Sequence, residues 1–544
     1  MTMKLLIKGR DDGCRELRPR RGLGLRRGLG LRRGLGLRRG LGLRRGLTAA
    51  VAALGIAATT AVPAASSSPS PSPLSAAGPA PALNAASIDR FVRDYLEQTR
   101  LPGAVVAVTS GDRVVHTAGY GRTASGEAMT ARTRVPVASL SKAMTALAVM
   151  RLVEAGKVDL DRPVHHYLPE FTMADRRARD ITVRQVLTQT SGMADAAYPD
   201  LTRPQPHTLK EAVAAMRGAH LDTAPGTRHR YHNPNYFVAA RLVEVVGGRP
   251  FAEQLSTELF EPLGMTDTES VDMTTRMPDG ARGYVRAYGT TFSRPHPRWF
   301  AAGSHGVVTT AEDLARWLIV QNNGGVSATG RRIVTARTIE LTHTPPKATK
   351  DTEYAMGWSA DRQDDGRPEI QHTGQLLTHN SMATLLPDSR VGIAVVTNTG
   401  LISGDDAPQL TQGLIDLARG RTPEVAAPFS MTADWFLAAL TLLATALGTT
   451  GVLRARRWAR RTAHRPWWRV TLRLLPHTLP ILLLTQLATL LGLLMNRSGT
   501  LAQTTYAWPA LVICTATAAL ASTTVIITRA VAVLRVARSG APTG

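Results

Sequence analysis

The sequence predicts an α+β domain followed by three membrane-spanning helices. β-rich segments lie near both ends of the stretch 84–424, and the residues between them have mainly helical periodicity. This order favours one antiparallel sheet covered by helices. Beyond residue 429 the chain has three apolar segments, each near the length that crosses a bilayer.

The elements of the domain can be assigned in chain order. Apolar spacing predicts a first helix at 87–100, and two β-rich segments at 103–109 and 113–119 are separated by a Ser-Gly-Asp turn. A helix is expected to begin at Ser139 and to end near Gly156. Later elements are expected as helices at 182–187 and 236–246 and as strands at 381–386 and 391–397.

The first 83 residues are predicted to form three segments that precede the domain. Residues 1–46 form a basic tail with four copies of Arg-Arg-Gly-Leu-Gly-Leu and a truncated fifth, whose glycines argue against a stable helix. Binding of anionic lipid, an expanded coding repeat and sequence upstream of the true start are alternative explanations for this tail. Residues 47–65 resemble a secretory signal, and residues 66–83, rich in Ser, Pro and Ala, an extended linker.

The net charge of +24 is concentrated at the two ends of the chain. Residues 1–46 carry a net +12 and residues 434–544 a net +11, which leaves +1 for residues 47–433. Basic residues beside apolar segments are typical of membrane topology, whereas a phosphate-binding surface would place them on the folded domain. We therefore expect membrane lipid as a partner and no nucleic acid.

Three apolar segments within residues 434–530 are the predicted membrane helices, at 435–453, 474–495 and 506–528. Eight arginines and no acidic residue separate the first from the second, but only Arg497 lies between the second and third. The positive-inside rule then places 454–473 and the tail 531–544 in the cytoplasm and the domain outside. Buried core helices are the alternative, but none of the segments contains Asp, Glu, Lys or Arg.

The domain contains no cysteine, because Cys14 lies in the basic tail and Cys514 in the third apolar segment. Disulfides and cysteine-ligated metals are thereby excluded from it. Its scattered histidines, among them His165, His166, His229 and His232, lack the spacing of a metal site. We predict neither a metal nor a cofactor.

Ser139-Leu140-Ser141-Lys142 is the stretch with the most chemical information. Residues i and i+3 share a helix face, so the amine of Lys142 can reach the Ser139 hydroxyl. A serine becomes a nucleophile beside a base, and a buried lysine can lose its proton whereas an arginine cannot. The chain has only seven lysines against fifty-eight arginines, which makes this lysine informative. The motif alone also occurs by chance on amphipathic helices.

Two further tripeptides supply candidate partners. From a Tyr-His-Asn tripeptide, Tyr231 can act as a base once a lysine cation lowers the pKa of its phenol. Asn233 can accept a hydrogen bond from that lysine and donate one to a substrate carbonyl. In His372-Thr373-Gly374, the histidine can be a second cation or a proton donor, and the glycine leaves room for a substrate backbone along a strand edge.

Taken in order, Ser-x-x-Lys, Tyr-His-Asn and His-Thr-Gly resemble the motifs of the serine β-lactamase and penicillin-binding protein superfamily. The closest branch is the class C β-lactamase-related group with its D-alanyl-D-alanine carboxypeptidases and esterases. The resemblance covers roughly residues 85–420 and includes Pro102-Gly103 and the segments at 183–192, 261–268 and 310–315. It implies a β-lactamase/transpeptidase-like fold, in which helices flank an antiparallel sheet and an all-helical subdomain lies beside it.

The resemblance also implies a role for each catalytic residue. Ser139 would attack a carbonyl and become acylated, and Lys142 would keep the proton relay poised. Tyr231 would take the serine proton and return it to the leaving group. Water would then release the acyl group.

The residues expected to bind substrate are Asn233, His372, Thr373, Gly374 and Gln375. The backbone N–H groups of Ser139 and Gln375 would form the oxyanion hole. His372 stands where β-lactamases have a lysine that binds the substrate carboxylate, and histidine is mostly neutral at pH 7. This departure disfavours efficient β-lactam hydrolysis, and Gln375, in place of a small residue, is expected to narrow the pocket mouth.

These observations predict a membrane-anchored, extracytoplasmic serine hydrolase. Its substrate would be a small molecule or peptide, such as a peptidoglycan peptide, a D-amino-acid peptide, an ester or a β-lactam. The alternative is a penicillin-binding sensor that is acylated or binds ligand without efficient turnover. A transporter is disfavoured because the predicted spans lack buried ionisable residues.

Overall fold

The computed structural model describes residues 83–349, 352–362, 366–400 and 406–539. The chain divides into two units, residues 1–77 and 78–544, and every described residue belongs to the second. The predicted basic tail, the signal segment and nearly all of the linker lie outside the described residues. So do the last five residues of the predicted cytoplasmic tail.

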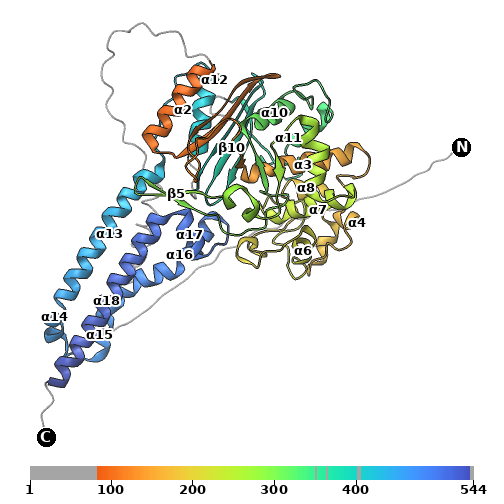
Figure 1. Cartoon of the computed structure of the whole chain (residues 1–544). Coiled ribbons are helices and arrows are strands. Elements are labelled where there is room, and N and C mark those ends of the chain that lie inside the picture. The colour runs from red at the N-terminus through yellow and green to blue at the C-terminus, as the bar shows by residue number, and fades with distance from the viewer. Residues whose placement is uncertain (1–82, 350–351, 363–365, 401–405, 540–544) are drawn as a thin grey trace, which may run out of the picture. The chain divides into compact units, whose positions relative to one another are not determined.

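A six-stranded antiparallel sheet forms the centre of the domain, which confirms the predicted α+β class (Figure 1). Its strands stand in the order β2-β1-β11-β10-β9-β8, so the N-terminal hairpin pairs directly with a strand from the end of the domain. The bounds are β1 Gly103–Ser110, β2 Arg113–Gly121, β8 Ser359–Arg362, β9 Pro368–Gln375, β10 Asn380–Leu386 and β11 Val391–Thr397.

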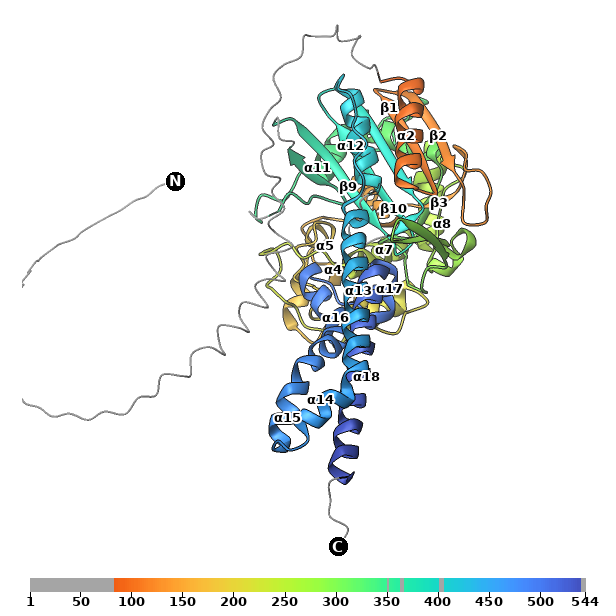
Figure 2. The same cartoon turned by 90° about the vertical axis from the view of Figure 1, so that its left-hand side faces the viewer.

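Both faces of the sheet are covered by helices. Val106 on β1 packs against α2 (Ala85–Thr99) and α12 (Asp406–Ala418), whereas its neighbour Val105 packs on the opposite face, toward α10 (Ala311–Asn322). Figure 2 shows α2 and α12 together on one side of the sheet. Successive strand residues point to opposite faces, so an uninterrupted apolar run indicates a strand buried on both sides.

The helices between β2 and β8 include those of the expected helical subdomain. The central helix is α3 (Ser141–Glu154), which is almost wholly buried and packs against α7 (Asn233–Gly247). Gly156, at a φ of 68°, ends the helical region as predicted. The other helices are α4 Val164–Tyr167, α5 Val183–Leu187, α6 Leu209–Ala214, α8 Phe251–Leu255, α9 Glu261–Leu263 and α11 Ala336–His343. The shorter strands are β3 Val135–Pro136, β4 Glu269–Ser270, β5 Gly283–Ala287, β6 Thr290–Arg294, β7 Val307–Thr309 and β12 Thr399–Gly400.

Three helices after the domain are long and apolar enough to cross a membrane, spanning Phe429–Leu453, Trp467–Met495 and Pro509–Arg538. The third differs from the predicted 506–528, because Tyr506 belongs to a separate short helix, α17 (Leu501–Ala507). Trp508 interrupts the helix at a φ of −155°, and Pro509, which lacks an N–H, begins a new one. The elements here are α13 Phe429–Leu453, α14 Ala455–Thr462, α15 Trp467–Leu474, α16 Leu479–Met495 and α18 Pro509–Ser539.

The first and third of these helices pack together through small residues. A Cβ at Gly448 of α13 would lie 2.6 Å from Cβ of Ala521, and one at Gly451 would lie 2.7 Å from Cγ2 of Val525 on α18. Close backbone approach at small residues is a common way in which membrane helices associate.

Candidate active site

Ser139 lies in a short 3-10 turn, Ala138–Leu140, directly before α3. The predicted helix therefore becomes α-helical two residues later than expected, with Lys142 in its first turn. Ala138 has a left-handed φ of 50°, which is uncommon for a residue with a side chain. The Ser141 hydroxyl donates to the Ala138 carbonyl at 2.6 Å and accepts from the Val307 N–H at 3.0 Å, and these bonds tie the turn to β7.

Lys142 is fully buried, and its amine has three oxygen neighbours. The Nζ atom lies 3.0 Å from Ser139 Oγ, 3.0 Å from Asn233 Oδ1 and 2.9 Å from the Ser304 carbonyl. Burial, and then the charge of Arg497, holds the pKa of Lys142 well below its usual value. A neutral amine has two hydrogens and one lone pair. Because the amide and carbonyl oxygens can accept both hydrogens, the lone pair is left for the Ser139 hydroxyl.

Tyr231 contacts both residues. Its hydroxyl is hydrogen-bonded to Ser139, and its ring centroid lies 4.8 Å from Lys142 Nζ. Burial raises the pKa of Tyr231 to about 12, although the hydrogen bond to Ser139 opposes the rise. At neutral pH the phenol therefore keeps its proton. The residues are together as predicted, but the structure favours the lysine over the expected phenolate as the group that gives up its proton.

Asn233 begins α7 and links the lysine to a buried carboxylate. Its Oδ1 accepts from Lys142, as predicted, and its Nδ2 donates to Asp200 Oδ2 at 3.2 Å. The expected donation to a substrate carbonyl therefore competes with Asp200. No pattern in the sequence indicates Asp200, because a lone aspartate in a short 3-10 turn belongs to no motif.

His372 is buried, and both of its ring nitrogens have partners. Nδ1 lies 2.6 Å from the Thr373 carbonyl, so it carries the hydrogen, and Nε2 accepts from the Tyr354 hydroxyl at 3.2 Å. Burial, with a smaller contribution from Lys142, lowers the pKa of His372 to about 3. The imidazole is therefore neutral at pH 7, and the interpretation of His372 as a second cation is not supported.

Gly374 is required for a reason other than the expected one. A Cβ at this position would overlap Ser381 Oγ and lie 2.6 Å from the Val137 carbonyl and 3.0 Å from Ala138 Cβ. The missing side chain leaves room for the turn that carries Ser139, rather than for a substrate backbone. Strand β9 and the nucleophile turn can therefore pack directly against each other.

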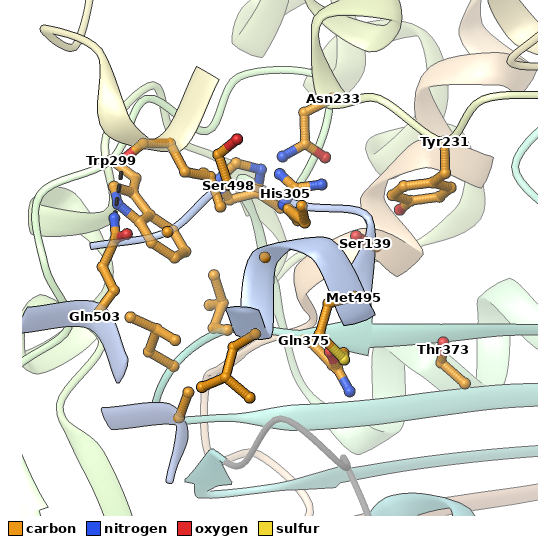
Figure 3. A pocket seen from close by; sticks show the side chains of 18 of the residues that line it. Ser139, Tyr231, Asn233, Trp299, His305, Thr373, Gln375, Met495, Ser498 and Gln503 are labelled. Carbon is orange, nitrogen blue, oxygen red and sulfur yellow. Dashed lines mark hydrogen bonds between the residues drawn. The ribbon is translucent and has the colours of Figure 1, made fainter. Parts of the chain in front are cut away.

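Ser139 opens into a cavity of about 660 Å³ (Figure 3). Six of the predicted residues line it, namely Ser139, Tyr231, Asn233, His372, Thr373 and Gln375, whereas Lys142 and Gly374 do not. Buried His305 also lines the cavity, and its Nε2 has no hydrogen-bond partner among the described residues. The rest of the lining comes partly from other residues of the catalytic domain, among them Leu201, Trp299 and Gln371, and partly from α16, α17 and their connection, which no motif in the sequence indicates.

Asp195, Asp200 and His232 form a buried group whose potential metal-ligand atoms lie within 4.8 Å of one another. Arg497 Nη2 lies 3.4 Å from Asp200 Oδ2, and the Ser498 N–H donates to Asp195 at 2.6 Å. The guanidinium supplies the positive charge that the carboxylates need, and it would repel a metal ion. These carboxylates are therefore contacts of the membrane region rather than a metal site.

Known proteins share this domain. Residues 88–418 match the family model described as Beta-lactamase. The chain is 31% identical over 340 residues to penicillin-binding protein 4 of Amycolatopsis lactamdurans, covering 60% of this chain and 89% of that protein. It is 26% identical over 332 residues to protein flp of Staphylococcus aureus strain N315, covering 60% of this chain and 65% of flp. The solved structure of the octameric penicillin-binding protein homologue from Pyrococcus abyssi aligns with a TM-score of 0.53 at 24% identity, covering 65% of this chain and 81% of that one, which shows the shared fold.

Proposed function

The chain belongs to the Beta-lactamase family, and on this premise we propose that it is a membrane-anchored serine hydrolase that forms an acyl-enzyme on Ser139. The observation that carries the proposal is the buried, low-pKa amine of Lys142, 3.0 Å from Ser139 Oγ. The likeness to a penicillin-binding protein supports β-lactams as ligands, and peptides and esters offer the same kind of carbonyl carbon to Ser139. The positive-inside arrangement of arginines supports a domain outside the cytoplasm.

Acylation uses the proton states that the site favours. Ser139 Oγ bonds to the substrate carbonyl carbon while its proton passes to Lys142. The backbone N–H groups of Ser139 and Gln375 stabilise the oxyanion. The bond to the leaving group then breaks, and the Tyr231 hydroxyl gives its proton to the departing atom. The proton on Lys142 restores the phenol, and water repeats the sequence to release the acid.

The neutral His372 favours esters and peptides over β-lactams. A lysine at this position would attract a substrate carboxylate, but an imidazole with a pKa of about 3 carries no charge at pH 7. Binding of a carboxylated substrate then lacks that cation, so we expect weak β-lactam hydrolysis.

Intact-mass spectrometry of the full-length protein in detergent tests the proposal. The protein is incubated with a penicillin and separately with an activated ester, and Ser139→Ala is the control. We expect an adduct or a released product that depends on Ser139. A long-lived penicillin adduct would favour the sensor alternative, and no adduct or product from either compound, with the protein folded by circular dichroism, would refute the proposal.

A further inference from the structure

One wall of the active-site pocket comes from a membrane helix. Ala488, Leu491 and Met495 recur at intervals of three and four residues, so one face of α16 lines the pocket. Figure 3 shows Met495 beside the pocket into which Ser139 opens. The helix belongs to Trp467–Met495, one of the three segments long and apolar enough to cross a membrane. The wall is therefore continuous with a surface suited to the bilayer.

Polar contacts hold the connection between α16 and α17 against the catalytic domain. Arg497 pairs with Asp200 at 3.4 Å, and the Ser498 N–H donates to Asp195 at 2.6 Å. Gln503 donates to a backbone carbonyl of the domain at 2.9 Å. Both carboxylates are buried, at 7% and 6% exposure. Buried carboxylates need polar partners, and the α16–α17 connection supplies them here. The connection is therefore an integral part of the structure around this site.

Apolar side chains predominate on one side of the nucleophile and polar side chains on the other. Leu201 and Trp299 of the catalytic domain join the α16 residues on the apolar side. The apolar side also holds His305, Ser498 and Gln503, and the Gln503 amide is already hydrogen-bonded within the protein. Gln371 and Thr373, two residues apart on β9, line the polar side. In Figure 3, Trp299 and Thr373 lie on opposite sides of Ser139. A substrate that fills both sides has a hydrocarbon chain on one side of the scissile bond and a polar group on the other.

We propose that the α16 face is an apolar-chain subsite, and that the substrate is an amphiphilic ester or amide whose hydrocarbon chain reaches Ser139 from the bilayer. The inference rests on the proposed acyl-enzyme and adds its substrate class. Each methylene that becomes buried strengthens binding roughly fourfold. The subsite therefore predicts a strong dependence of turnover on chain length.

The test compares 4-nitrophenyl octanoate with 4-nitrophenyl acetate, using the full-length protein in detergent micelles. The readout is the ratio of the two kcat/KM values, because a general loss of activity cancels from it. We expect a ratio above about 10 for the unmodified protein and at least a roughly fivefold fall in Met495→Gln and Leu491→Gln. Leu494→Gln and Leu490→Gln alter the same helix outside the pocket lining and should keep the ratio.

Each outcome decides the proposal. Similar kcat/KM values for both esters, or an equal fall in the control variants, would overturn the subsite and leave the acyl-enzyme standing. Turnover of neither ester by the unmodified protein would overturn the subsite, and the penicillin adduct on Ser139 would then decide the acyl-enzyme separately. If the glutamine variants do not fold, Met495→Ala and Leu491→Ala give the same comparison without a polar group. A lower ratio then supports the subsite, and an unchanged ratio overturns it.

Discussion

The two walls of the active-site pocket are built in different ways. The catalytic wall centres on a buried amine whose three oxygen neighbours come from three separate segments of the domain. The membrane wall is an apolar helix face that is fixed by an ion pair and backbone hydrogen bonds at its end. The first arrangement controls where protons reside, and the second controls which molecules fit. Chemistry and specificity can therefore be tested separately by changes to one wall at a time.

The largest expected effect comes from Lys142→Arg on the catalytic wall. Arginine keeps the positive charge but cannot lose its proton, so Ser139 is left without a base. We expect the kcat/KM for an activated ester to fall about 10³-fold, within the range for loss of a general base. Lys157→Arg, at an exposed lysine, is the matched control and should have no effect. Activity of Lys142→Arg within tenfold of the unmodified protein would contradict the role of the amine.

The sequence predicts the contacts of the site that are local in the chain and misses those between distant residues. Ser139 and Lys142 meet within one helical turn, so their spacing alone indicates the contact. Asp200 and Arg497 meet across 297 residues, and a single aspartate and a single arginine form no pattern. The proton state of Tyr231 depends on burial, which local sequence does not reveal.

The fold, like the site, is predictable from the sequence where the signal is local. Strands β1, β2, β10 and β11 are predicted because each is a local β-rich run, whereas β8 and β9 of the same sheet are not predicted. The helices at 87–100, 182–187 and 236–246 are predicted because apolar spacing is local too. The break at Trp508 was missed, since it lies inside a continuous apolar stretch whose hydropathy does not change there. The Pro509 that follows was the available signal.

A smaller effect is expected from Gly374→Ala, because Gly374 packs against the turn that carries Ser139. The added methyl would overlap Ser381 Oγ and crowd the Val137 carbonyl, so either β9 or the nucleophile turn must move. We expect a loss of about 1–3 kcal/mol in stability, as is usual for overpacking, together with slower acylation of Ser139.

Thermal unfolding in detergent and the intact-mass assay measure the two effects of that substitution. Gly218→Ala is the control, because a Cβ there meets nothing within 4 Å. Its stability should change by less than about 0.5 kcal/mol. Equal behaviour of the two alanine variants would show that the turn does not depend on close packing at Gly374.

The smallest effect is expected from Arg497→Gln. This substitution connects the two walls, because Arg497 lies on the membrane wall and its charge acts on Lys142 of the catalytic wall. Protonation of Lys142 removes the base, so kcat/KM should fall as the pH drops through the lowered pKa of this lysine. The positive charge of Arg497 contributes to that lowering, after burial. Without it the pKa of Lys142 rises, and the acidic limb of the pH profile moves to higher pH. At pH 7 we expect a loss of up to about fivefold, the size of a change near 1 kcal/mol.

Arg294→Gln separates this charge effect from a loss of docking. The Arg294 guanidinium lies 3.5 Å from the ring centroid of Tyr506 and donates to the Thr505 carbonyl at 3.1 Å, so it also joins the domain to α17. It is not among the charges that shift the pKa of Lys142. Kinetic pH profiles of both variants should therefore differ, with the acidic limb displaced only in Arg497→Gln. An equal displacement of the acidic limb in both variants would contradict this. The docked position of the membrane wall would then set the pKa of Lys142, and the charge of Arg497 would have no separate effect.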